Sequence, residues 1–183
     1  IVVPVPDTAK AAADAYAFHV GAPCMEGVIR NRYVGRTFIQ PVSTREKSAK
    51  SKYTTVRSLM QGQRVFLVED SIVRSLTLKT LIAQIRENGG AAEVHVRVAC
   101  PPIVGLCFYG INMSSVEELF APRFVTSRYK GDPTPQMLQK MARLLKVDTL
   151  KYLPTSSLGD TINVEQDSLC LGCVTAKYPS SWG

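Results

Sequence analysis

The sequence of 183 residues has no apolar run long enough to cross a bilayer and no basic leader followed by an apolar segment. These absences argue against a membrane-spanning or secreted protein. The five Cys, an odd number without a secretory leader, favour a reducing compartment over a disulfide framework. We therefore expect a cytoplasmic protein with no membrane partner. The chain opens on a strand-like run without Met, so we also expect an N-terminally truncated fragment.

The chain also lacks internal repeats, low-complexity segments and any Ser/His/Asp arrangement typical of a nucleophilic hydrolase. Its net charge is +7, and the excess is concentrated in residues 30–57, which hold many Lys and Arg but a single Glu. Such a segment is a solvated loop or a site for phosphate or nucleic acid. Few aromatic residues interleave with the cations, so we do not expect a nucleic-acid partner.

Apolar periodicity predicts an α/β fold with a parallel sheet and helices on both faces, because strands and helices alternate along the chain. The predicted strands are 1–5, 25–29, 65–68, 93–100, 107–111 and 149–153. The predicted helices are 8–20, capped by Asp7 and Thr8, a turn near 52–60, 76–88, a short helix opened by a capping box at 114–117, and one starting at 134–135. We expect residues 1–155 to form one domain and 156–183 to form a cysteine-containing tail packed on it.

The stretch VFLVEDSIVRSLT (65–77) places two adjacent carboxylates, Glu69 and Asp70, at the end of an apolar strand. A turn rich in hydroxyls and the start of a helix follow, where unpaired backbone N–H groups and the helix dipole favour an anion such as a phosphate monoester. The carboxylates would then reach sugar hydroxyls or a divalent metal. Helix capping beside an exposed acidic pair is an equally compatible reading of the spacing.

These thirteen residues resemble the ribose-phosphate motif of type I phosphoribosyltransferases, in the form found in the glutamine phosphoribosylpyrophosphate amidotransferases. Four further stretches resemble motifs of the same family: VPVPDT (3–8), RNRYVGRTFIQP (30–41), CPPIVGLCFYGI (100–111) and CLGCVTAKYPS (170–180). The resemblance spans nearly the whole chain. It implies the C-terminal phosphoribosyltransferase domain of such an enzyme.

The resemblance implies an amidophosphoribosyltransferase, in which ammonia attacks C1 of phosphoribosyl pyrophosphate and pyrophosphate leaves, the first step of purine synthesis. The family's glutamine-splitting domain has no counterpart in these residues, so we expect the chain to depend on that domain and to form a homo-oligomer. An alternative of another class stays open: a non-catalytic regulator that binds phosphoribosyl pyrophosphate or a nucleotide.

By the family pattern, Arg36, Glu69 and Asp70 are the expected catalytic residues, and Thr8 joins Glu69 and Asp70 around Mg²⁺. The residues expected to bind substrate are Pro6, Asp7, Thr8, Arg36, Arg45, Lys52, Glu69, Asp70, Ser71, Ile72, Val73, Arg74, Ser75 and Thr77. Arg36, Arg45 and Lys52 would lie on a loop that closes over the substrate and excludes water.

Two positions depart from the family pattern, and they bear on activity. Ser75 replaces a Gly and Leu76 replaces a Thr. A Gly there tolerates a positive φ that Ser adopts only at a cost, and Leu removes a hydroxyl donor. These changes point slightly towards the regulator, whereas the intact RNRYVGRTFIQP stretch favours the enzyme.

One branch of the family holds a four-iron cluster on four cysteines, and three of its positions match Cys107, Cys170 and Cys173. The resemblance implies a structural iron–sulfur site whose fourth ligand position lies upstream of residue 1. Without the fourth ligand, bare thiols or adventitious Zn²⁺ are the alternatives. Cys24 and Cys100 match no ligand position, and we expect both in the core.

Overall fold

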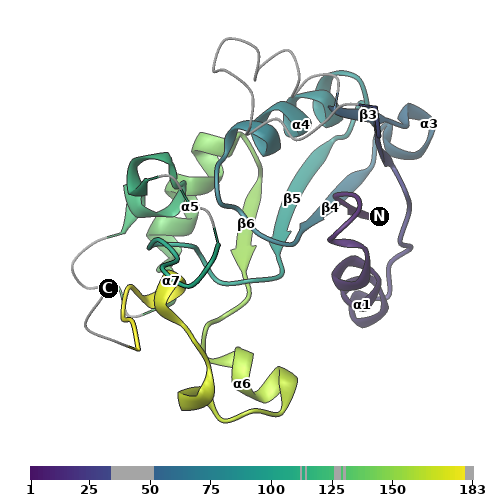
Figure 1. Ribbon diagram of the computed structural model, residues 1–183. Helices are drawn as coiled ribbons and strands as arrows, with labels where there is room; N and C mark the ends of the chain where they lie inside the picture. The colour runs from purple at the N-terminus through teal and green to yellow at the C-terminus, as the bar shows by residue number, and fades with distance from the viewer. Residues whose placement is uncertain (34–51, 112, 114, 126–128, 130, 180–183) are drawn as a thin grey trace.

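The structure is a computed structural model that describes residues 1–33, 52–111, 113, 115–125, 129 and 131–179. Within these residues the central sheet contains four strands in the order β1-β4-β5-β6, and all its pairings are parallel. The strands are β1 Val2–Pro4, β4 Arg64–Glu69, β5 Glu93–Val98 and β6 Thr149–Tyr152. The predicted α/β class with a parallel sheet is confirmed (Figure 1).

Helices cover both faces of this sheet, as the alternation of elements predicts. The main helices are α1 Lys10–Val20, α4 Leu76–Glu87 and α5 Pro135–Leu145. Ala13 and Ala17 of α1 pack against Val2 and Val68 on one face. The other face packs against α4 and α5 in the larger core. Figure 1 shows α1 on the opposite side of the sheet from α5.

Strand β5 shows that α1 covers only part of its face. Val94, Val96 and Val98 are buried towards α4 and α5, whereas Glu93, His95 and Arg97 alternate onto the face that α1 covers beside β1 and β4. A strand covered on both faces would be apolar throughout. The polar alternation in the sequence therefore reflects incomplete cover on the α1 side.

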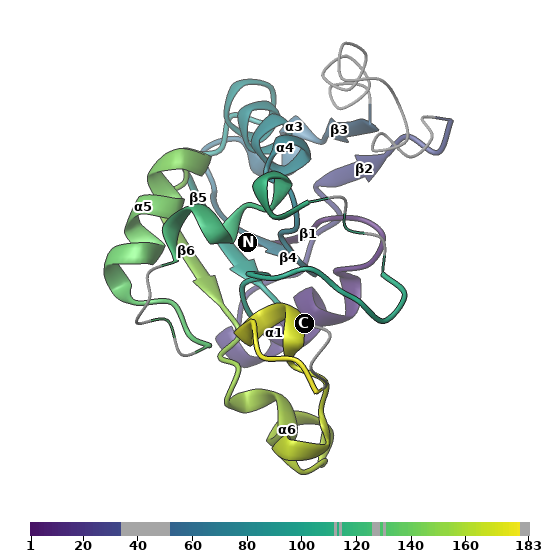
Figure 2. The same cartoon turned by 60° about the vertical axis from the view of Figure 1, so that its left-hand side comes forward.

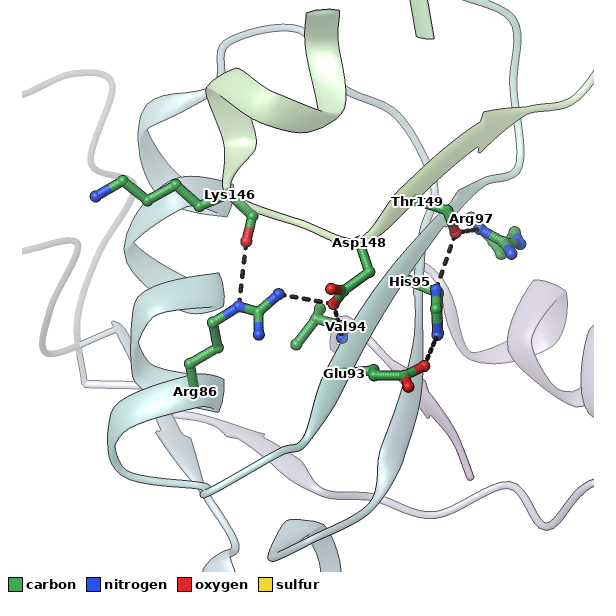
Figure 3. A network of polar contacts seen from close by, with 8 residues as sticks. All are labelled: Arg86, Glu93, Val94, His95, Arg97, Lys146, Asp148 and Thr149. Atoms are coloured by element: carbon green, nitrogen blue, oxygen red, sulfur yellow. Dashed lines mark hydrogen bonds and ion pairs between the residues drawn. The ribbon is translucent and has the colours of Figure 1, made fainter. Parts of the chain in front are cut away.

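A polar network fastens the start of β6 to β5 and to the end of α4 (Figure 3). Asp148 Oδ2 accepts bonds of 2.7 Å from both Arg86 Nη2 and the Val94 backbone N–H. Arg86 Nε also donates to the Lys146 carbonyl at 3.1 Å. Partial burial alone would raise the pKa of Asp148, but the Val94 amide and the Arg86 guanidinium together lower it. The network therefore contains a stabilised carboxylate.

Parallel register brings the carboxyl ends of β1 and β4 to one edge of the sheet. Pro4 lies beside Val68, and the Val5 N–H donates to the Val68 carbonyl at 2.8 Å. The turn after β1 and the Glu69–Asp70 pair after β4 therefore start from adjacent points. Ligands in open parallel sheets bind at this edge.

A separate antiparallel hairpin corrects part of the prediction. The strand expected at 25–29 forms as β2 Val28–Arg30, and it pairs with β3 Tyr53–Thr55 rather than with the main sheet. The turn expected near 52–60 is reduced to α3 Arg57–Met60, because β3 occupies its first residues. In Figure 2 the hairpin lies at the upper right, apart from the ends of β5 and β6.

The first helix and a later strand also differ from the prediction. Asp7 and Thr8 do not cap α1, since Ala9 is the N-cap position and no side chain bonds there. No strand forms at 107–111, which the structure describes as bends beyond the sheet. Gly110 there has a φ of +115° and Phe108 packs edge-on against Tyr178.

The short helix expected from 114–117 forms only as a 3₁₀ turn, η2 Val116–Glu118, followed by a second, η3 Ala121–Phe124. The tail contains α6 Ser157–Ile162, η4 Gln166–Ser168 and α7 Gly172–Thr175. It contacts the rest of the chain where Val104 N–H donates to the Cys173 carbonyl at 2.8 Å. The proposed domain boundary near residue 155 stays a prediction. Within the described ranges, every helix is too short or too polar to cross a bilayer.

Candidate active site

A cavity of about 290 Å³ lies at the joint carboxyl ends of β1 and β4. It is lined by Val5, Pro6, Asp7, Thr8, Arg30, Lys52, Tyr53, Glu69, Asp70, Ser71, Ile72, Val73, Arg74, Thr77 and Leu78. Among the described residues, three larger cavities lie elsewhere: two of about 610 Å³, on α6 and between α5 and β6, and one of about 450 Å³ along α4. None of the three contains the acid pair, so we take the smaller cavity as the candidate site.

The acid pair and the turn after β1 meet in this cavity. Asp70 Oδ1 accepts the Ser71 backbone N–H at 2.6 Å, and Glu69 Oε1 accepts the Asp70 N–H at 3.1 Å. Thr8, which was expected both to cap α1 and to lie with the acid pair, bonds to the Asp70 carboxylate. The hydroxyl and both carboxylates therefore converge from two strand ends.

The two carboxylates differ electrostatically although they are neighbours. Burial, and next the adjacent Asp70, raise the pKa of Glu69 well above its usual range. Burial also acts to raise the pKa of Asp70, but hydrogen bonds from Glu69, Thr8 and Ser71 outweigh it and lower that pKa. The hydrogen bond between the two side chains therefore favours the ionised form of Asp70 and the protonated form of Glu69.

Three cations line the same cavity from different elements: Arg30 and Lys52 from the hairpin, and Arg74 from the turn before α4. Arg30 Nη1 lies 3.2 Å from Asp7 Oδ2. Burial, and next the charge of Arg30, lower the pKa of Lys52. Its ammonium lies 5.2 Å from the centre of the Tyr53 ring. The cavity therefore presents both cations and carboxylates to one ligand.

The start of α4 forms one wall of the cavity through Thr77 and Leu78. The positive end of this 12-residue helix favours an anion there. Ser75 has a φ of −84°, so this position does not require a positive φ, and the expected backbone cost of Ser in place of Gly does not arise. Ser75 does not line the cavity, whereas Arg74 and Thr77, which were predicted with it, do.

The structure thus brings together eleven of the expected substrate-binding residues: Pro6, Asp7, Thr8, Lys52, Glu69, Asp70, Ser71, Ile72, Val73, Arg74 and Thr77. Arg36 and Arg45 lie outside the described residues. Their assignment, and the catalytic and metal-binding roles of the others, stay predictions.

Four lining residues were missed by the sequence reading: Val5, Arg30, Tyr53 and Leu78. Arg30 opens the RNRYVGRTFIQP stretch, so the basic motif itself was the available signal. Tyr53 is 7% exposed, and burial followed by Glu69 raises its pKa to about 12. A single aromatic after Lys52 carries no sequence signal, because only the hairpin pairing turns it towards the acid pair.

The residues present fit Mg²⁺ but give no complete iron–sulfur site. Two carboxylates and the Thr8 hydroxyl are the oxygen ligands that Mg²⁺ takes in proteins. The charges of Cys107 and Cys170 both act on Cys173, so the three predicted cysteines lie in one region. Within the described residues, however, no group of three or more His, Cys, Asp or Glu side chains is arranged to hold a metal ion. The cluster stays a prediction.

Comparison with known proteins shows what the chain is similar to. No family model matches the chain. A parallel sheet with this site at its carboxyl edge is the arrangement of a phosphoribosyltransferase-like α/β domain. The solved glutamine phosphoribosylpyrophosphate amidotransferase from Bacillus subtilis, complexed with ADP and GMP, is similar in fold, with a TM-score of 0.75 and 39% identity. The match covers 97% of this chain and 37% of that chain.

Curated relatives agree with the structural match. The amidophosphoribosyltransferase of Methanothermobacter thermautotrophicus is 41% identical over 181 residues, which cover 98% of this chain and 35% of that protein. The Bacillus subtilis amidophosphoribosyltransferase is 40% identical over 98% of this chain and 36% of its own length. Nearly the whole chain is therefore homologous to amidophosphoribosyltransferases, and it spans about a third of the length of the curated relatives it matches.

Proposed function

We propose that the chain binds phosphoribosyl pyrophosphate and transfers its phosphoribosyl group to ammonia, as an amidophosphoribosyltransferase. One observation carries this proposal: the acid pair, three cations and the start of α4 line one cavity at the carboxyl ends of β1 and β4. This set suits a ligand that has a sugar, a phosphate monoester and a magnesium-bound pyrophosphate. The names of the relatives support it, and glutamine is the proposed source of ammonia in the complete enzyme.

Thr8, Glu69 and Asp70 are the proposed ligands of Mg²⁺. When bound, the ion neutralises the negative charge that develops on the departing pyrophosphate. The carboxylates are also proposed to stabilise the positive charge that develops on the ribose ring. Asp70 is the stronger candidate for an ionised ligand, since hydrogen bonds hold its pKa low.

The cations of the cavity have a complementary role. Arg30 on the hairpin lies beside Asp7 of the turn after β1, where the pyrophosphate is proposed to bind, and Lys52 lines the same cavity. Arg74 and the N-terminus of α4 are proposed to take the phosphate monoester. The ligand would therefore lie across the cavity, with the ribose over the acid pair.

The test is turnover of phosphoribosyl pyrophosphate with ammonium chloride as the second substrate, followed by release of pyrophosphate. We expect release that requires Mg²⁺, and a loss of about 100-fold or more in the Asp70→Asn variant. Asp167→Asn, the same change at an exposed position, should leave the rate unaltered. Magnesium-dependent binding without pyrophosphate release would instead favour the regulator.

A further inference from the structure

Two contacts tie the turn before α4 to the segment that contains η2. The Phe120 backbone N–H donates to the Val73 carbonyl at 2.9 Å. One residue further along the turn, Arg74 Nη2 lies 2.5 Å from Glu118 Oε2. Backbone and side chain of the turn are therefore both held by residues 118–120, more than forty positions away in sequence.

The segment that carries Glu118 is itself firmly anchored. Leu119, Phe120 and Ala121 follow it directly and are at most 1% exposed. Phe120 also packs edge-on against Phe124, with ring centres 5.3 Å apart. The backbone that carries the Glu118 carboxylate is therefore held in place, so the ion pair constrains where the Arg74 guanidinium lies.

The position of Glu118 relative to the cavity decides what the ion pair does. Arg74 lines the cavity, whereas Glu118 does not. The carboxylate therefore holds the guanidinium without occupying the ligand's space. A guanidinium has five N–H donors in a planar fork, which is a geometry that can bind a carboxylate and a phosphate at the same time. A carboxylate that the ligand had to displace from Arg74 would instead line the cavity.

We propose that Glu118 is a positioning residue, which orients Arg74 towards the phosphate of the substrate. This inference rests on the proposed function of the site. Without the carboxylate, the long Arg74 side chain would have to be ordered when the ligand binds. Ordering one such side chain corresponds to a loss of about 3- to 10-fold in affinity.

The test is a double-mutant cycle on the dissociation constant of phosphoribosyl pyrophosphate with Mg²⁺, measured by calorimetry. We expect Glu118→Gln to weaken binding about 3- to 10-fold, and Arg74→Met to weaken it more. Adding Glu118→Gln to Arg74→Met should cause no further loss. Glu117→Gln, the same change at the exposed neighbour on η2, is the matched control and should bind as the unaltered chain does.

Urea unfolding of each variant separates an effect on binding from an effect on folding. Glu118→Asp keeps the charge, so its affinity for phosphoribosyl pyrophosphate should fall between those of the unaltered chain and Glu118→Gln. Tighter binding by Glu118→Gln would show that the carboxylate competes with the ligand for Arg74, and this would overturn the proposal. Equal binding, or losses that add in the double variant, would also overturn it. If the unaltered chain binds no phosphoribosyl pyrophosphate, the proposed function fails as well. Additive losses in a chain that binds would refute the role of Glu118 alone.

Discussion

The carboxylate of Asp148 should stabilise the sheet that positions the candidate site, and Asp148→Asn tests this. The residue accepts bonds of 2.7 Å from the Val94 amide and from Arg86. Hydrogen bonds to a charged group contribute about 1.5–3 kcal/mol, against about 1 kcal/mol for neutral pairs. Because the Asp148 side chain is 41% exposed, solvent screening reduces the difference, and we expect a loss of about 1–2 kcal/mol.

The sign of the pH dependence follows from the lowered pKa of Asp148. A depressed pKa in the folded chain stabilises it above the usual Asp value, and this contribution is lost as the pH falls through the folded pKa. Urea unfolding should therefore show the full loss in Asp148→Asn at about pH 7, and a smaller one at about pH 3. Asp167→Asn is the exposed control. A difference that persists unchanged at the lower pH, or one no larger than the control's, would refute the assignment.

Three further predictions concern the core and the site. Met60→Ala should lower the free energy of unfolding by about 3 kcal/mol in urea, because Met60 is fully buried, whereas Leu144→Ala, at a 40% exposed position, should lose less than half of that. Equal losses would contradict the burial of Met60. Glu69→Gln should stabilise the ligand-free chain by about 1 kcal/mol in the same assay, since it removes a buried acid beside Asp70, and a destabilised variant would contradict this. Lys52→Met should weaken phosphoribosyl pyrophosphate binding about 10-fold by calorimetry with little change in unfolding, and unaltered binding would remove Lys52 from the site.

The sequence predicted the parts of the fold in which local pattern and tertiary packing agree. The apolar run at 65–68 is the interior of β4, and the helical period of Leu78, Leu81, Ile82 and Ile85 is the buried face of α4. These features depend on periodicity, which a sequence displays. The adjacency of the acid pair to the turn after β1 was implied by the family pattern, which placed Thr8 beside Glu69 and Asp70.

The features that sequence reasoning missed depend on contacts between distant residues. Thr8 is a residue type that favours helix caps, but it does not cap α1, and the folded sheet provides Asp70 as the partner of its hydroxyl. The strand predicted at 107–111 fails because that segment packs on Tyr178 instead of joining the sheet. Glu118 has no local signal at all, since its partner Arg74 is distant in sequence.

The most direct test of the account is calorimetric titration with phosphoribosyl pyrophosphate. It is done on the unaltered chain and on Asp70→Asn, once in the presence of Mg²⁺ and once with the metal chelated. The account predicts binding that is strong only with Mg²⁺, and an Asp70→Asn variant that folds normally but has lost the metal-dependent part. Equal binding with and without metal, or an Asp70→Asn variant that binds as the unaltered chain does, would contradict it.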